Sequence, residues 1–141
     1  MTGLLHKIRD GELILPGISQ TLGCAVLRIG ENEDEVECSY QIGPQFLNPA
    51  EQVQGGILCA MLDDVTSLLI INAIGPGASI ATLNLNTSFI RPGTPGGFRG
   101  MAKLVRHGRE VCNVTGELWQ EGKLIATATA VSKILPVKPR D

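Results

Sequence analysis

Two adjacent carboxylates, Asp63 and Asp64, stand in the middle of a long apolar stretch that opens with Gly55 and Gly56. In a helix successive side chains turn by about 100°, so at least one of the two is expected to be buried or to line a cavity. Burying an ionised carboxylate without a partner is unfavourable. A carboxylate in a cleft is therefore a candidate base or nucleophile. The alternative is an acid that only makes a structural hydrogen bond or lies exposed at an edge.

The glycine pair supplies a second chemical feature. The first N–H groups of a helix have no partner inside the helix, and its positive end favours negative charge. Because Gly55 and Gly56 carry no side chains, a ligand can reach these N–H groups. The stretch therefore combines a candidate anion-stabilising donor with an acid two turns further along.

Other catalytic arrangements find little support. Ser39 and Ser67 lie outside any nucleophile-elbow pattern, and His6 and His107 are isolated. The cysteines form no CxxC pair and two histidines do not complete a usual zinc set, so we expect four reduced, structural thiols at positions 24, 38, 59 and 112.

The elements that must position these groups follow from periodicity. Residues 55–73 have apolar positions at helical spacing on nearly every side, and Gly75–Pro76–Gly77 ends them. Strand patterns cover residues 23–29, 35–42, 79–90, 98–106, 110–120 and 123–135. Residues 11–17 and 44–54 are expected to be loops, and Glu121–Gly122 a two-residue hairpin turn.

This order predicts a single α+β domain over residues 1–141, with an N-terminal arm (1–17) and a tail (136–141). Residues 2–10 are expected to form a short polar helix or to be part of the arm. A five- or six-stranded antiparallel sheet would curl around one central helix. A helix that is apolar on all sides needs cover on the side away from the sheet. A second copy of the chain is the simplest cover.

Composition limits the partners. The chain has 141 residues and a net charge of −2, but residues 1–70 carry −7 and residues 71–141 carry +5. The balance argues against nucleic acid, and no stretch is long enough to span a bilayer, so we expect a cytoplasmic protein. An anionic ligand should meet the second half, where basic residues gather at positions 91, 99, 103, 106 and 109. The alternative for this group is a solvated strand face.

The motifs together resemble a known family. They are Asn48-x6-Gly55-Gly56-x6-Asp63, then Thr82-Leu-Asn-Leu-Asn-Thr-Ser-Phe-Ile-Arg-Pro, then His-Gly-Arg109. Their order over residues 35–135 resembles the hotdog-fold acyl-CoA thioesterases of the PaaI type (phenylacetyl-CoA thioesterase). That resemblance implies an antiparallel sheet wrapped around a long helix, homodimers or homotetramers, and hydrolysis of acyl-CoA to a free acid and coenzyme A without metal or cofactor.

The resemblance also implies roles for individual residues. Asp63 matches the catalytic carboxylate, as general base or nucleophile, and the N–H of Gly55 matches the donor that polarises the thioester carbonyl. Asn48 matches a side chain near the attacking water or carbonyl, and Thr82 a hydroxyl that holds water. Segments 89–94 and 106–111 match coenzyme A contacts, with Lys133 a weaker match; the chosen positions are Phe89, Ile90, Arg91, Pro92, Arg106, Gly108 and Arg109.

One position departs from the family pattern. The family usually has histidine before the two glycines, and this chain has Gln54. An amide can donate and accept a hydrogen bond but does not titrate near neutral pH. A non-catalytic acyl-CoA binding or sensing protein is therefore an open alternative. A hydratase or dehydratase of the same fold, which usually needs a histidine in the helix region, is a weaker alternative.

Asp64 is expected either to act on Asp63 electrostatically or to lie at the dimer seam.

Overall fold

The computed structural model describes residues 3–136 of the chain. The helical elements are α1 (Leu4–Arg9), α2 (Gly17–Thr21), the 3-10 turn η1 (Pro44–Phe46) and the long helix α3 (Gly55–Ile74). The strands are β1 (Ala25–Ile29), β2 (Glu35–Ile42), β3 (Ala78–Phe89), β4 (Gly96–His107), β5 (Val111–Gln120) and β6 (Lys123–Pro136). The element order agrees with the α+β fold expected from the sequence, and the sheet has six strands.

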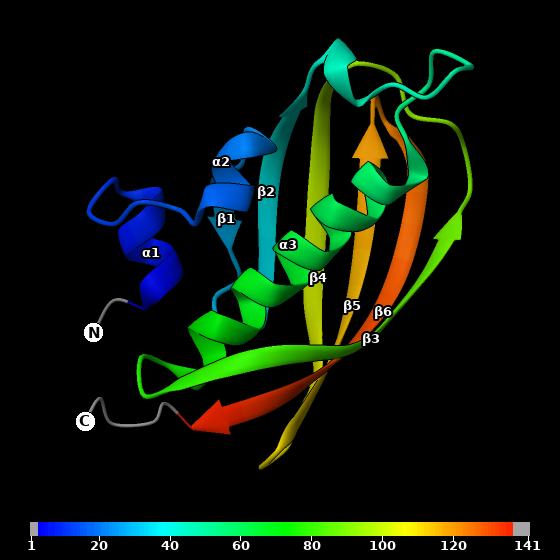
Figure 1. Ribbon diagram of the computed structural model, residues 1–141. Helices are drawn as coiled ribbons and strands as arrows, with labels where there is room; N and C mark the ends of the chain where they lie inside the picture. The colour runs from blue at the N-terminus through cyan, green and yellow to red at the C-terminus, as the bar shows by residue number, and fades with distance from the viewer. Residues whose placement is uncertain (1–2, 137–141) are drawn as a thin grey trace, which may run out of the picture.

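The strands form one antiparallel sheet in the order β1-β2-β4-β5-β6-β3, and α3 crosses its concave face (Figure 1). β3 follows α3 directly, but it lies at the far edge of the sheet and pairs with β6, from Ala78 opposite Pro136 to Phe89 opposite Ala126. The pairing register shifts between Thr82 and Asn84, which marks a β-bulge at Leu83.

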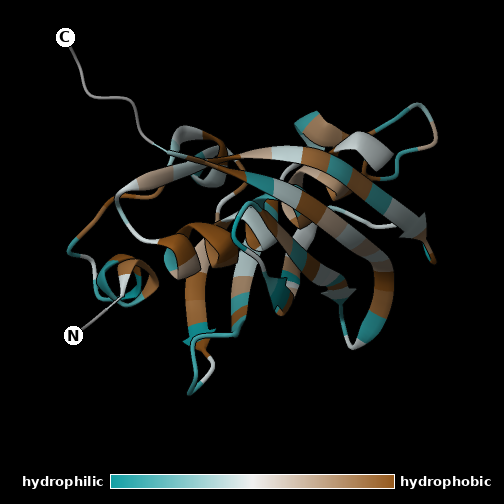
Figure 2. Ribbon diagram, turned by 90° about the horizontal axis from the view of Figure 1, so that it is seen from below, coloured by the Kyte–Doolittle hydropathy of each residue, from teal (hydrophilic) through white to brown (hydrophobic). Residues whose placement is uncertain are grey.

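The core lies between α3 and the sheet. Along α3, every residue from Ile57 to Ile74 is buried or half-buried, and Met61, Leu62, Val65 and Leu69 are completely buried. Figure 2 shows the helix as a hydrophobic rod inside the curled sheet. α3 is long and apolar enough to cross a bilayer by length and composition, which corrects the expectation that no stretch of the sequence is. Its burial identifies it as a core helix, and no membrane protein is indicated.

The N-terminal segment packs beside α3 and contains a helix that the sequence did not predict. The backbone N–H of Leu5 donates to Asn72 Oδ1 over 3.0 Å, which fixes α1 against the end of α3. The expected loop over residues 11–17 ends at Pro16, and the unpredicted helix α2 follows it from Gly17. Strand bounds differ from expectation by two residues at most, and residues 137–141 of the expected tail lie outside the described residues.

The convex face of the sheet carries ion pairs. Glu37 contacts Arg28 and Arg99, and Glu35 contacts Arg28 and Lys103, at N–O distances of 3.0 to 3.7 Å. Arg99 and Lys103 therefore pair with carboxylates of β2 while more than half of each side chain stays exposed, as on a solvated strand face. Their contact with an anionic ligand stays a prediction.

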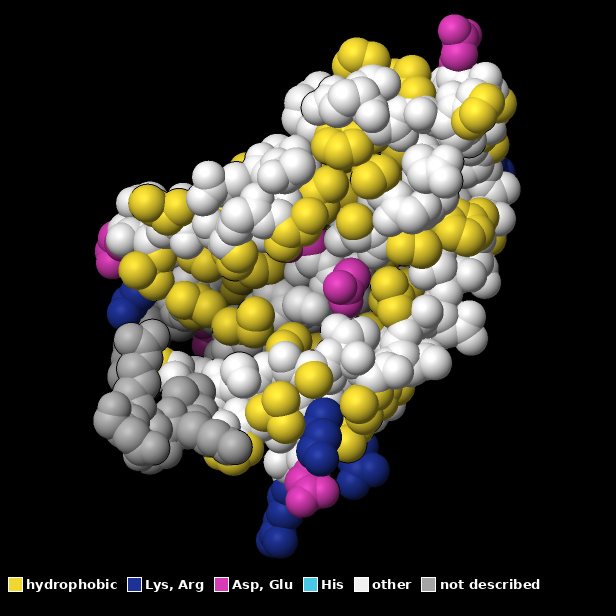
Figure 3. Space-filling view, in the orientation of Figure 1, with side chains coloured by type: hydrophobic (Ala, Val, Ile, Leu, Met, Phe, Trp, Pro, Cys, Tyr) yellow, Lys and Arg dark blue, Asp and Glu magenta, His cyan; other side chains and the backbone are white. Residues whose placement is uncertain are grey.

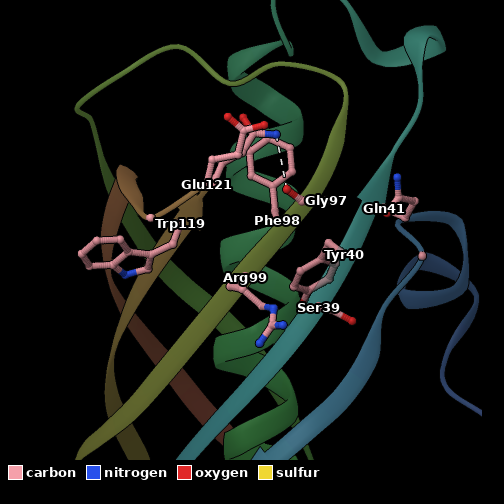
Figure 4. Close-up of a pocket in the computed structure, with 11 residues that line it drawn as sticks. Ser39, Tyr40, Gln41, Gly97, Phe98, Arg99, Trp119 and Glu121 are labelled. Carbon is pink, nitrogen blue, oxygen red and sulfur yellow. Dashed lines mark hydrogen bonds between the residues drawn. The ribbon is translucent and has the colours of Figure 1, made fainter.

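A hollow of about 470 Å³ lies on the same convex face, beside Ser39, Gln41, Gly97 and Trp119 (Figure 4). In that view α3 lies behind the sheet, so this hollow is separated from the acidic pair. It contains none of the site residues expected from the sequence.

Candidate active site

The helical phase of α3 sends the two adjacent carboxylates to different places. Asp64 lies on the buried side with Met61 and Leu68, three residues before it and four after it. Asp63 lies on a half-buried stripe that continues to Ser67. The expectation that at least one of the pair is buried or lines a cavity is therefore confirmed for both, in different ways.

Asp63 reaches the edge strand of the sheet. The hydroxyl of Thr82 donates a hydrogen bond to Asp63 Oδ1 over 3.2 Å. The bulge at Leu83 makes this contact possible, because it shifts the alternation of β3 by one residue. Thr82 before the bulge and Thr87 after it both contact α3, the latter through Cys59 at 3.6 Å. In a regular strand, side chains five positions apart point to opposite faces, so one of these two threonines would point away from α3.

Asp64 is enclosed within the subunit by hydroxyl donors. Ser19 Oγ donates to its Oδ1 over 2.6 Å, and the Tyr40 hydroxyl donates to its Oδ2 over 2.8 Å. Burial raises the pKa of Asp64, and the hydrogen bonds from Ser19 and Tyr40 offset part of that rise. Asp64 thus joins α2, α3 and β2 inside one chain, and its expected place at a dimer seam stays a prediction.

The start of α3 meets the end of β3. A Cβ placed on Gly55 would lie 3.4 Å from Cζ of Phe89, so the aromatic ring closes over this glycine. A hollow of about 480 Å³ at this point is lined by Gly55, Leu58 and the segment Phe89–Pro92, among others. The N–H of Gly55 donates to no acceptor within the described residues. The structure thus brings Gly55 together with Phe89, Ile90, Arg91 and Pro92, and their expected roles toward a ligand stay predictions.

The two amide side chains expected near this point, those of Gln54 and Asn48, differ in the hydrogen bonds that they make. Gln54 is the N-cap residue of α3, and its exposed side chain makes no capping hydrogen bond. Asn48 accepts from the backbone N–H groups of Ala50 and Gln52 at 3.0 and 3.1 Å, which folds the loop before the helix. With its carbonyl oxygen engaged, Asn48 has its NH₂ group left to meet a ligand.

Gln120 is a structural contributor that the sequence did not single out. Its Oε1 accepts from the N–H and hydroxyl of Thr94, and its Nε2 donates to the carbonyls of Thr94 and Gly97. The carbonyl of Gly93 accepts from the N–H of Val53, just before α3. The loop that follows Phe89 is therefore fixed on both sides. A glutamine at the end of a strand gives no sequence signal that it fixes a distant loop.

The remaining basic candidates lie elsewhere. Arg106, Gly108 and Arg109 line a hollow of about 370 Å³ at the β4–β5 turn, at the end of the sheet opposite to Phe89 (Figure 1). Arg91 Nη1 donates to the carbonyl of Leu124 over 3.0 Å. One subunit therefore does not bring the two expected coenzyme A segments together.

Gly55 and Asp63 are also separated. They lie eight residues apart on α3, which is about 12 Å along a helix axis. A single reacting carbon needs contacts of about 3–3.5 Å, so these two groups of one chain do not act on the same atom. Among residues 3–136 no group of three or more His, Cys, Asp or Glu side chains is placed to hold a metal ion.

The fold is that of the hotdog thioesterases. Residues 45–132 match the family described as the acyl-CoA thioesterase N-terminal domain, and the chain belongs to this family. The matched region contains every site residue named above from Asn48 to Arg109.

Solved structures support the same assignment. A phenylacetic acid degradation-related protein of Ralstonia eutropha JMP134 is 48% identical, with a TM-score of 0.86 over 92% of this chain and 98% of that chain. The thioesterase HI1161 of Haemophilus influenzae is 20% identical, with a TM-score of 0.82 over 96% of this chain and 93% of that chain, and it shows the fold alone.

A curated relative is more distant. The Mycobacterium tuberculosis protein Rv1847, described as an esterase, is 30% identical over 79 residues, which are 54% of this chain and 56% of that protein. The alignment thus spans about half the length of the curated relatives it matches.

Proposed function

We propose that the protein hydrolyses acyl-CoA thioesters to a free acid and coenzyme A. The observation that carries this proposal is the contact of Asp63 with Thr82 on a hotdog scaffold, in a chain that belongs to the acyl-CoA thioesterase family. A half-buried carboxylate oriented by a hydroxyl donor has the geometry of a base that faces a bound water or carbonyl.

The chemistry needs few groups because a thioester is already activated. In the general-base form, Asp63 takes a proton from water while the water oxygen bonds to the carbonyl carbon. The N–H of Gly55 stabilises the negative oxygen of the tetrahedral intermediate, a contribution of about 3 kcal/mol in comparable sites. The carbon–sulfur bond then breaks, coenzyme A leaves as a thiolate, and the proton is released. The proposed reaction uses no metal or cofactor.

We further propose that the working unit is a homodimer or an assembly of such dimers. β3 offers a twelve-residue open edge, with Leu83, Phe89 and Ile90 exposed beside it. A long exposed edge pairs readily with a second copy. A two-fold axis beside β3 would bring Gly55 of one subunit toward Asp63 of the other, which resolves their separation within one chain.

Hydrolysis of a panel of short, aromatic and long acyl-CoA thioesters tests the proposal. Wild-type protein should release free thiol, and Asp63→Asn should abolish release while circular dichroism stays unchanged, because the amide is nearly isosteric but is not a base. Asp64→Asn should retain more activity. A protein inactive on the whole panel, or an active Asp63→Asn variant, contradicts the proposal.

Gln54 supports a second candidate, a non-catalytic acyl-CoA binding protein of the same fold. Its exposed amide replaces the histidine usual at this position and does not titrate near neutral pH. This candidate predicts saturable binding of acyl-CoA without thiol release in the same assay. Under either candidate we place the protein in the cytoplasm, in keeping with its four free cysteines.

A further inference from the structure

The hollow on the convex face of the sheet takes no part in the reaction steps above. Its volume of about 470 Å³ lies within the roughly 300–1,000 Å³ typical of small-molecule sites. It is open because Gly97, an exposed residue of β4, has no side chain. A Cβ placed on Gly97 would lie 3.7 Å from Gln41 Oε1 and 3.9 Å from the carbonyl oxygen of Tyr40, so a side chain could project into the hollow without a clash.

The register of the strands surrounds Gly97 with polar and aromatic side chains. Ser39 of β2 lies opposite Arg99 of β4, and Arg99 lies opposite Trp119 of β5. Two residues further along, Gln41 lies opposite Gly97. Figure 4 shows Trp119 on one side of Gly97 and Gln41 on the other, with Arg99 and Ser39 beside them. The hollow therefore has a glycine floor and a rim that offers an indole ring, a guanidinium, a hydroxyl and an amide.

Hydrogen bonds hold the two largest side chains of this rim. Arg99 Nη1 donates to Glu37 Oε1 over 3.0 Å, and Trp119 Nε1 donates to Glu117 Oε2 over 2.8 Å. A guanidinium carries five N–H groups, so the bond to Glu37 leaves others for a ligand. The bond from the indole N–H likewise leaves the face of the ring free. Both groups are oriented before a ligand arrives, which lowers the entropic cost of binding.

Two unlike charges line the hollow. Arg99 is its cation, and Glu121, at the turn between β5 and β6, is its carboxylate. Within residues 3–136 Arg99 pairs with Glu37 and not with Glu121. A phosphate or a simple cation is attracted by one of the two lining charges and repelled by the other. A zwitterion is attracted by both.

The concave face differs in charge. Figure 3 shows this face hollowed across its middle, where acidic atoms lie among hydrophobic side chains and no lysine or arginine of the described residues is seen. The sheet separates the hollow around Gly97 from α3 and Asp63, which lie behind it in Figure 4. A ligand bound around Gly97 therefore does not compete with a thioester for the proposed catalytic carboxylate.

We propose that the hollow around Gly97 binds a small zwitterion that carries an aromatic group, which is the chemistry of a free aromatic amino acid. The ligand carboxylate accepts hydrogen bonds from Arg99, its ammonium group pairs with Glu121, and its ring packs against Trp119. This site goes beyond the hydrolysis proposed above and does not depend on it.

Titration of L-phenylalanine into the full chain tests the proposal, with the fluorescence of Trp119 as the readout. Trp119 is the only tryptophan of the chain, so a saturable change reports on the hollow itself. N-acetyl-L-phenylalanine lacks the ammonium group, and 2-phenylethylamine lacks the carboxylate. Each should bind about two- to fivefold more weakly, which is the range of exposed ion pairs. L-Alanine keeps both charges without the ring and should bind about tenfold more weakly.

Substitutions locate the ligand. Gly97→Leu fills the hollow at a residue without a positive φ and should abolish the fluorescence change. Thr129→Leu is the matched control, because it adds the same side chain at an exposed position of β6 outside the hollow, and it should bind as the wild type does. Glu121→Gln, at an exposed turn, should weaken L-phenylalanine by about two- to fivefold and leave N-acetyl-L-phenylalanine unchanged.

Glu121→Gln also covers a folding failure of Gly97→Leu. The proposal is overturned if L-phenylalanine shows no saturable binding or if all four probes bind with equal affinity. It is likewise overturned by an unchanged affinity for L-phenylalanine in Gly97→Leu or Glu121→Gln, or by a loss of binding in Thr129→Leu.

Discussion

Thr82 donates a hydrogen bond to Asp63 across 19 positions of sequence, from the edge strand of the sheet to the middle of the core helix. The contact orients one carboxylate oxygen and leaves the other for a ligand. It also ties the candidate catalytic group to β3, the strand on which we propose that a second subunit pairs.

Removing this hydroxyl should slow hydrolysis. A hydrogen bond to a charged group contributes about 1.5–3 kcal/mol, so Thr82→Val should reduce kcat by about 10- to 100-fold with a smaller change in KM. Thr82→Ser retains the donor and should recover most of the rate. Steady-state kinetics on one acyl-CoA check this. Equal losses in the valine and serine variants would show that the methyl group, and not the hydroxyl, matters.

The active site should be shared between subunits. Gly55→Pro removes the N–H and adds a ring, at a first helical position that proline tolerates, and should lower kcat by about 10²–10³. Gly55→Ala keeps the N–H and is the control, since its Cβ would meet Phe89 at an ordinary contact distance of 3.4 Å.

Subunit mixing completes this test. Coexpression of Gly55→Pro with Asp63→Asn places both changes in one site of a mixed dimer and leaves the other site intact, so about a quarter of wild-type activity should return with random pairing. Sites contained in one chain would each carry a lesion, and activity would stay at the level of the single variants.

Gln54→His should leave the protein active and add a pH dependence. The exposed side chain before Gly55 has no capping role to lose. Histidine changes its charge over about pH 5–8, whereas glutamine does not titrate. Rate profiles of both proteins from pH 5 to 9 provide the measurement. Complete loss of activity in the variant would show that the pocket depends on the amide.

Arg109→Ala should raise KM for acyl-CoA and weaken its salt dependence, with little effect on kcat. Arg109 lines a hollow at the β4–β5 turn that does not include Asp63, and exposed charge contacts weaken as the Debye length falls from about 10 Å at 0.1 M salt to about 3 Å at 1 M. Acyl-N-acetylcysteamine thioesters lack the phosphates and serve as the control. Equal damage with both substrate types would assign Arg109 a structural role.

Asp64 should make stability depend on pH in an unusual direction. Burial raises its pKa above the ordinary 3.8, so the folded chain binds this proton more tightly than the unfolded chain does. Its contribution to stability is complete below about pH 4 and is lost as pH rises through the raised pKa. Relative to Asp64→Asn, the wild-type free energy of unfolding should fall from pH 4 upward, as urea denaturation measures. A constant difference, or a rising one, would contradict this.

The sequence predicted the helix and the sheet well because their signals are local. The stop after α3 and the turn at Glu121–Gly122, where both residues have positive φ, depend on neighbouring residues. The helical phase of α3 could also have predicted which of the two carboxylates is buried. Asp63 shares a face of the helix with Ala60 and Ser67. Asp64 shares another face with the apolar residues Met61 and Leu68.

The features that the sequence did not predict depend on distant partners. The bulge at Leu83 follows from the register of β3 against β6, and no glycine marks it. α2 has only five residues, and the buried hydrogen bond from Ser19 to a residue 45 positions away helps to fix it. The pairings of Arg99 and Lys103 follow from the β2–β4 register, whereas the sequence shows only a basic cluster.

The position of β3 affects when the site can form during synthesis. In the described sheet β3 has one neighbouring strand, β6, which is also the last strand of residues 3–136. Thr82 is therefore held beside Asp63 only after residues 123–136 have left the ribosome, although both partners are made much earlier. Until then, a core helix with a buried acid and an unpaired twelve-residue strand are exposed to the cell together. Such a nascent chain is a natural client for chaperones.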